Sequence, residues 1–99
     1  MEDTVEVLHQ RCAGLDVHKK TVVAAVRLVE GNKVITEVRT FATTTAGLLA
    51  LADWLTQNGC KQVAMEATGV YWKPVWAVLE DRFELMLVNA RHVKHVALV

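Results

Sequence analysis

The chain has 99 residues, of which 53% are hydrophobic, and its eleven basic residues balance eleven acidic ones. This length suits one domain and is too short for two, and the apolar content excludes a disordered chain. No apolar run reaches the roughly 18 residues that span a bilayer, and the acidic start MEDTVEVLHQ lacks the regions of a signal peptide. We therefore expect a cytoplasmic protein without membrane contact.

Two local features qualify this composition. Cys12 and Cys60 are isolated from each other, without CxxC spacing or a zinc-ligand pattern, so we expect buried, reduced cysteines. Near the end of the chain, Arg91 and Lys94 lie in a stretch without acidic residues. Such a stretch can contact phosphates, but by itself it is more typical of a solvated helix face.

Three strands are predicted after a variable tail over residues 1–10. Residues 11–17 alternate between apolar and polar positions, with Asp16 on the polar face. Residues 21–29 form a β-branched run that suits a buried strand, and residues 33–42 alternate again. A Gly-Asn pair between the last two segments favours a hairpin. The segment is therefore predicted to be a meander.

A helix is predicted next, because threonines 43–45 offer N-cap hydroxyl groups. An apolar stripe follows at helical spacing, formed by Leu48, Leu51, Ala52 and Leu55. Trp54 lies off this stripe, so it is expected at the surface or toward a partner. Asn58 and Gly59 predict the end of the helix.

The remaining elements are a strand, a helix and a strand. Residues 61–67 form the fourth strand, in which Glu66 shares a face with Gln62 and Ala64. After a turn at Thr68 and Gly69, a second helix is predicted, with Pro74 in its first turn, where a missing N–H costs nothing. Residues 83–89 form the fifth strand. The second helix has an apolar stripe that is expected to face the core of the domain, formed by Trp72, Val75, Trp76 and Leu79.

The succession β-β-β-α-β-α-β predicts the fold class. A meander followed by βαβ crossovers produces a mixed sheet with helices packed on it. This is the succession of the α/β ribonuclease-H-like fold, whose five-stranded sheet has the order 3-2-1-4-5. The first and fourth strands are then neighbours.

In this order Asp16 and Glu66 approach each other near the ends of two apolar strands. Two adjacent carboxylates repel, and a divalent cation relieves the repulsion; oxygen ligands suit Mg²⁺ or Mn²⁺. Two such ions can activate water and stabilise a leaving 3′-oxygen in phosphodiester cleavage. The alternative is structural: Asp16 caps a turn with Lys19 or Lys20, and Glu66 begins a helix. From spacing alone the two interpretations are about equally supported.

Three segments, taken together and in this order, resemble the RuvC-like DEDD transposases of bacterial insertion sequences. They are residues 14–19 (GLDVHK), 65–72 (MEATGVYW) and 88–94 (VNARHVK). The resemblance extends from about Cys12 to Val96. It implies that Asp16 and Glu66 are catalytic residues and ligands of a two-metal site that binds Mg²⁺ or Mn²⁺.

The same resemblance implies that the site is incomplete here. The family pattern continues to a D-x-x-D pair that supplies the last two ligands, and then to a domain with a serine proposed as the DNA nucleophile. This chain has no acidic residue after Glu84. Residues 11–99 are therefore expected to be a RuvC-like amino-terminal domain, truncated before the last two acidic residues and unable to cut DNA alone.

Several other residues are candidates for nucleic-acid contact, each with a structural alternative. His18, Lys19 and Lys20 could contact backbone phosphates or be ordinary turn residues. Thr68 and Gly69 could bind an anion at a helix amino terminus or only form the turn. The remaining candidates, for base stacking or phosphate contact, are Tyr71, Arg91 and Lys94.

The leading functional hypothesis is an enzyme domain for DNA strand cleavage and joining in transposition. Its expected partners are the DNA of the element ends and target, a guide RNA implied by the resemblance, and further copies of the chain. One alternative is a non-catalytic fragment that binds nucleic acid or dimerises. An actin-like ATPase fold is disfavoured, because residues 18–21 (HKKT) lack the glycine that a phosphate-binding turn requires.

Overall fold

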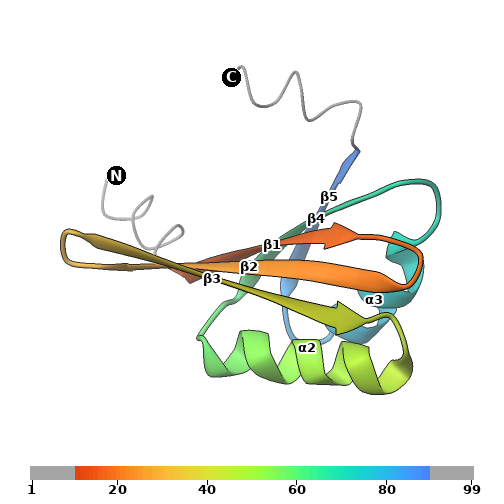
Figure 1. The fold of residues 1–99 in the computed structure, drawn as a ribbon, viewed down its shortest axis with the longest axis horizontal. Helices are drawn as coiled ribbons and strands as arrows, with labels where there is room; N and C mark the ends of the chain where they lie inside the picture. The colour runs from red at the N-terminus through yellow and green to blue at the C-terminus, as the bar shows by residue number, and fades with distance from the viewer. Residues whose placement is uncertain (1–10, 90–99) are drawn as a thin grey trace.

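The computed structural model describes residues 11–89, which form one mixed sheet in the order β3-β2-β1-β4-β5 (Figure 1). β1 pairs antiparallel with β2, and β2 with β3, whereas β1, β4 and β5 run parallel. The predicted sheet order is confirmed. The strands are β1 (Arg11–Val17), β2 (Thr21–Glu30), β3 (Lys33–Ala42), β4 (Gln62–Ala67) and β5 (Glu84–Asn89).

A two-residue turn joins β2 and β3. Glu30 and Lys33 are Cα partners on either side of it. Gly31 has φ 60°, a left-handed conformation that costs glycine little because it has no Cβ. The predicted hairpin is therefore confirmed, and the tight turn fixes its register.

Helix α2 (Thr45–Gln57) follows β3. The Thr44 side-chain oxygen accepts a hydrogen bond of 3.0 Å from the Gly47 N–H, which satisfies a free amide of the first turn. The helix is followed by Gly59, with φ 73°. The predicted stripe is buried in full: Leu48, Leu51, Ala52 and Leu55.

Helix α3 (Trp72–Leu79) has Pro74 in its first turn, as predicted. Its Val75 and Leu79 are fully buried. The stripe predicts Trp72 and Trp76 in the core as well, but they are only partly buried against it. Their rings pack edge to face against each other, with centroids 5.8 Å apart.

The expectation for Trp54 is wrong. This side chain is only 5% exposed, its ring centroid lies 5.5 Å from that of Phe41, and the Arg39 guanidinium lies 5.4 Å above the ring. The physical reason is tertiary. β3 passes over α2, so the side of the helix that carries Trp54 is buried although it lies off the leucine stripe.

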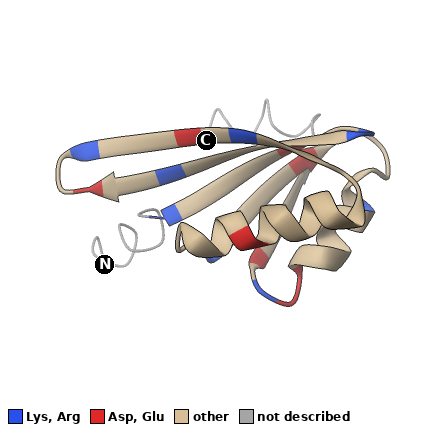
Figure 2. Ribbon diagram, turned by 60° about the horizontal axis from the view of Figure 1, so that its bottom comes forward, with Lys and Arg blue, Asp and Glu red and all other residues tan. Residues whose placement is uncertain are grey.

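Both helices lie on the same side of the sheet (Figures 1 and 2). Alternate strand residues point into the core that the helices cover: Ala13, Leu15, Val17, Val22, Ala24, Val26, Val63 and Met65. We call the opposite side of the sheet, with Gly14 and Asp16 of β1 and Ala64 and Glu66 of β4, the outer face. Neither α2 nor α3, the helices of the described residues, is long and apolar enough to cross a membrane.

Candidate active site

Asp16 and Glu66 are direct Cα partners on the parallel strands β1 and β4. Their chain neighbours Leu15, Val17 and Met65 point into the core, so strand alternation directs both carboxylates to the outer face. Neighbouring strands lie about 4.8 Å apart, which places the two side chains within reach of a common ion. The prediction that they lie on adjacent strands and one face is confirmed.

His18 is the immediate neighbour of Asp16. Its Nε2 lies 3.0 Å from Asp16 Oδ2, and because an ionised carboxylate only accepts, the imidazole N–H is the donor. The His18 backbone N–H donates to the Thr21 carbonyl at 2.8 Å, which closes the turn after β1. The side chains of His18 and Asp16 are 54% and 60% exposed. His18 therefore combines a turn position with direct contact to the candidate ligand.

The neighbours of this carboxylate pair across the sheet are apolar. Val23 of β2 is the Cα partner of Asp16, and Val88 of β5 is that of Glu66. Sequence reasoning did not single out either valine, although the strand register would have identified them. Within residues 11–89 no three His, Cys, Asp or Glu side chains are placed to hold a metal ion together.

The two carboxylates fit the expected metals in part. Both are oxygen donors near the carboxyl ends of two neighbouring strands, on the outer face of the sheet, which suits Mg²⁺ or Mn²⁺. Two carboxylates supply fewer ligands than a two-metal site requires, so further oxygen donors would have to complete it. The donor chemistry therefore agrees with the expected cofactor, and the number of ligands from the described residues does not.

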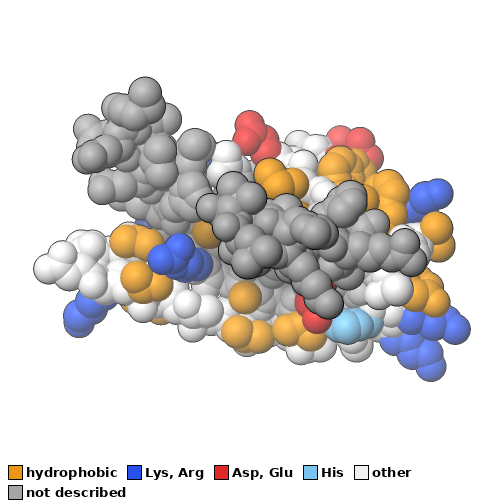
Figure 3. Space-filling model, turned by 90° about the horizontal axis from the view of Figure 1, so that it is seen from above, with side chains coloured by type: hydrophobic (Ala, Val, Ile, Leu, Met, Phe, Trp, Pro, Cys, Tyr) orange, Lys and Arg blue, Asp and Glu red, His pale blue; other side chains and the backbone are white. Residues whose placement is uncertain are grey.

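Lys19 and Lys20 lie in the exposed turn between β1 and β2, at the same end of the sheet as Asp16. Their backbone carbonyls are fixed by Thr43: its hydroxyl donates to Lys19 at 2.9 Å, and its N–H donates to Lys20 at 3.0 Å. In Figure 3, basic side chains gather beside the histidine and an acidic side chain at this end. The turn thus presents positive charge next to the carboxylates.

Thr68, Gly69 and Tyr71 form the connection from β4 to α3, and all three lie at least partly at the surface. The expectation that Thr68 and Gly69 lie at the helix amino terminus is wrong, because the cap residue is Tyr71. Gly69 has φ 61°, a left-handed conformation that keeps the helix from starting earlier. Tyr71, which is not part of the apolar stripe, is 41% exposed. Arg91 and Lys94 lie outside the described residues.

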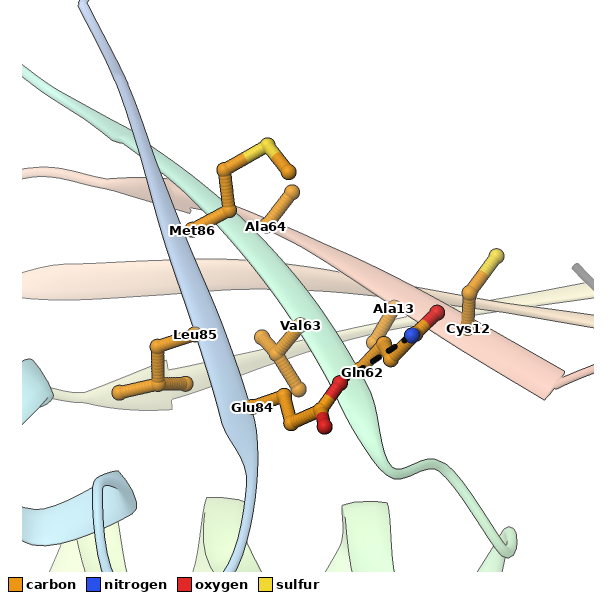
Figure 4. A pocket seen from close by; sticks show the side chains of 8 residues that line it. All are labelled: Cys12, Ala13, Gln62, Val63, Ala64, Glu84, Leu85 and Met86. Atoms are coloured by element: carbon orange, nitrogen blue, oxygen red, sulfur yellow. Dashed lines mark hydrogen bonds between the residues drawn. The ribbon is translucent and has the colours of Figure 1, made fainter. Parts of the chain in front are cut away.

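A separate pocket of ≈ 360 Å³ lies at the other end of β1, β4 and β5 (Figure 4). Its polar wall includes Gln62, whose Nε2 donates to Glu84 Oε2 at 3.2 Å, and Cys12. Ligands of α/β sheets bind outside the carboxyl ends of parallel strands, whereas this pocket lies at the amino ends. It is therefore distinct from the carboxylate pair.

The sequence matches a family model of DEDD transposases, described as transposase, over residues 13–98. No curated protein matches significantly. The solved structures with a similar fold include fowlpox virus resolvase, determined with Holliday junction DNA (15% identity, TM-score 0.57, 79% of this chain and 60% of that chain). They also include Thermus thermophilus RuvC (15%, 0.59, 86% and 67%) and Archaeoglobus fulgidus Pelota (14%, 0.62, 97% and 33%).

At these identities the structural likeness shows the fold alone. With RuvC and the viral resolvase among its neighbours and a sheet order of 3-2-1-4-5, the fold is ribonuclease-H-like. The chain spans 60% of the viral resolvase, which is less than two thirds of its length.

Proposed function

Since the family model covers nearly all of it, this chain belongs to the DEDD transposase family, and from that premise we propose that its domain takes part in metal-dependent cleavage and joining of DNA strands during transposition of an insertion sequence. The observation that supports the proposal is the in-register pairing of Asp16 and Glu66 on neighbouring parallel strands. Both carboxylates lie on the face that the core leaves exposed. They are the proposed catalytic residues and metal ligands.

In this proposal Asp16 and Glu66 hold Mg²⁺ or Mn²⁺. Bound divalent ions would supply activation of a water and stabilisation of the leaving 3′-oxygen. His18 holds one carboxylate oxygen of Asp16 by a hydrogen bond of 3.0 Å, which restrains the orientation of the carboxylate and leaves its other oxygen for a metal ion. His18 is thus a positioning residue.

Nucleic-acid contacts are proposed around the same end of the sheet. His18, Lys19 and Lys20 would contact backbone phosphates, because they are exposed beside Asp16. The other proposed contacts are Thr68, Gly69, Tyr71, Arg91 and Lys94. The proposed partners are the DNA of the element ends and target, a guide RNA, and further copies of the chain, in the cytoplasm.

The proposed domain boundaries are a variable tail over residues 1–10 and a RuvC-like amino-terminal domain over residues 11–99. The described residues supply two adjacent carboxylates and hold no three-ligand metal cluster. This small number of ligands favours a domain that needs further acidic residues in order to cut DNA. It equally supports the second candidate function, a non-catalytic fragment that binds nucleic acid.

The decisive experiment compares this chain with a longer version that carries the D-x-x-D pair of the family pattern. We expect Mn²⁺-dependent cleavage of branched or linear DNA only in the longer protein, and loss of cleavage in its Asp16→Asn variant. The substitution is nearly isosteric but removes the charge that holds the metal. Glu30→Gln, which alters an exposed carboxylate in the distant hairpin, is the matched control.

Three results are informative. Full activity of the Asp16→Asn variant would remove this residue from the mechanism. Robust metal-dependent cutting by the 99-residue chain would show that two carboxylates suffice. DNA binding by both proteins, without cutting by either, would favour the non-catalytic function.

A further inference from the structure

β3 is an edge strand with large apolar side chains exposed on both of its faces. Val34 and Val38 point to the outer face and are 55% and 64% exposed, while Ile35 points to the helix side and is 40% exposed. All residues from 33 to 40 are exposed. Among the described strands β3 pairs only with β2, and their hairpin extends beyond the rest of the sheet (Figure 1). Long apolar edges of this kind are ready to pair with another strand.

The backbone direction of β3 follows from its ladder with β2. The Thr43 N–H donates to the Lys20 carbonyl at 3.0 Å, in continuation of the register that pairs Ala42 with Thr21. Because hydrogen-bonding direction alternates along an antiparallel strand, odd-numbered residues of β3 face β2. Even-numbered residues direct their N–H and C=O groups outward: Val34, Thr36, Val38 and Thr40.

We propose that β3 pairs antiparallel with β3 of a second copy of this chain, about a two-fold axis at Val38, to form a continuous ten-stranded sheet. Outward-facing residues must pair with outward-facing residues, so the axis passes at a residue and not between two residues. An axis at residue 37 or 38 then gives the longest overlap, nine residues of the ten-residue strand. An axis at Glu37 places this carboxylate against its own copy. An axis at Val38 places valine against valine.

Charge complementarity selects the Val38 register. In it, Glu37 lies opposite Arg39 of the second copy, and Arg39 lies opposite Glu37 of the second copy. Opposite charges directly across a strand pair are favourable and like charges are not. Figure 2 shows an acidic segment between basic ones along this strand. β3 is therefore self-complementary in sequence as well as in backbone direction.

The two charged residues are available for this pairing. The salt bridges among the described residues join His18 to Asp16 and Arg82 to Asp53, and neither involves Glu37 or Arg39. The Arg39 guanidinium already lies over the Trp54 ring of its own chain. This contact reduces the side-chain freedom that Arg39 would lose on association.

The pairing has a consequence for the carboxylate sites. A two-fold axis between antiparallel strands keeps the outer faces of both copies on the same side of the extended sheet. The two Asp16 residues would then be separated by five strand spacings of about 4.8 Å, or roughly 25 Å across the sheet. This inference concerns assembly and holds whether or not the carboxylates cut DNA.

The test uses charge reversal on the 99-residue chain and sedimentation equilibrium. We expect the wild type to form a dimer with a Kd below about 100 µM. Glu37→Arg and Arg39→Glu should each raise the dimer Kd about tenfold or more, since every cross-strand attraction becomes a repulsion. An equimolar mixture of the two variants should form a heterodimer, because each of its two cross-strand pairs again joins an arginine to a glutamate.

Val38→Lys, at the residue on the axis, should weaken the dimer as well. Val70→Lys is the control, since Val70 lies between β4 and α3 and is similarly exposed (61%), and this variant should dimerise like the wild type. Circular dichroism of each variant establishes that it is folded; if Arg39→Glu unfolds, Glu37→Arg and Val38→Lys decide alone. A monomeric wild type at 100 µM and above overturns the proposal. So does dimerisation of Glu37→Arg at wild-type affinity, or a mixture of folded variants that stays monomeric. None of these outcomes bears on metal binding or cleavage.

Discussion

At the scale of single residues, Asp16 depends on its strand for direction and on His18 for orientation. The hydrogen bond between them joins two side chains that are both more than half exposed. Exposed pairs of this kind contribute little to stability. The interaction therefore matters for where the carboxylate oxygens point, and substitutions at either residue should be tolerated by the fold.

Cys60 is the residue for which the structure predicts a pH dependence. Burial of the side chain, together with the nearby Cys12, raises the pKa of the Cys60 thiol above its usual 9.0, and Arg11 opposes the shift. The folded chain then keeps this proton to higher pH than the unfolded chain does. Stability from this group is complete below pH 9.0 and is lost as the pH rises above it.

We therefore expect the free energy of unfolding to fall between pH 8 and pH 10 more steeply for the wild type than for Cys60→Ala. Urea denaturation of both proteins at the two pH values measures the difference. The comparison tests Cys60, because Cys60→Ala removes only this thiol. Parallel pH dependence in the two proteins would contradict the assignment.

At the scale of elements, the first turn of α2 approaches the end of β3 closely. A Cβ added at Gly47 would collide with the carbonyl group of Ala42. Helix propensity alone predicts that Gly47→Ala stabilises α2 by about 1 kcal/mol. The close approach predicts the opposite, because a backbone carbonyl cannot move aside as a flexible side chain can.

Gly47→Ala should lower the melting temperature by about 4–8 °C for each kcal/mol of net destabilisation in a domain of this size. Gly14→Ala is the matched control, since a Cβ at Gly14 meets no atom within 4 Å. Thermal unfolding of the three proteins checks the prediction. An unchanged or raised melting temperature in Gly47→Ala would show that the helix and strand separate easily.

At the scale of the whole molecule, the core and the candidate site are independent. The core consists of hydrophobic side chains between the sheet and the two helices, and it contains no charged or polar residue among those described. Asp16 and Glu66 lie on the outer face, away from that core. Folding should therefore not require a metal.

We expect EDTA to leave the melting temperature of the chain unchanged, and millimolar Mn²⁺ to raise it only slightly. Two carboxylates bind the ion weakly, and a ligand near its Kd stabilises a protein by only about 0.4 kcal/mol. Asp16→Asn should remove even this small effect, whereas Glu30→Gln should retain it. A large loss of stability in EDTA would mean that the metal is part of the fold.

The sequence alone predicted the order of the elements, the faces of the strands and the pairing of Asp16 with Glu66. These features depend on local periodicity and on connection rules that admit few topologies. The two-residue alternation of β1 and β4 decides which side chains share a face, independently of the rest of the structure.

Only the tertiary structure decided the burial of Trp54, the partial exposure of Trp72 and Trp76, and the long exposed edge of β3. Periodicity along one helix identifies its most apolar side but not how widely neighbouring elements cover it. β3 has the alternation of a half-buried strand, yet residues 33–40 are exposed, and its hairpin with β2 extends beyond the rest of the sheet (Figure 1). Burial is a relation between segments distant in the sequence, and no local pattern contains it.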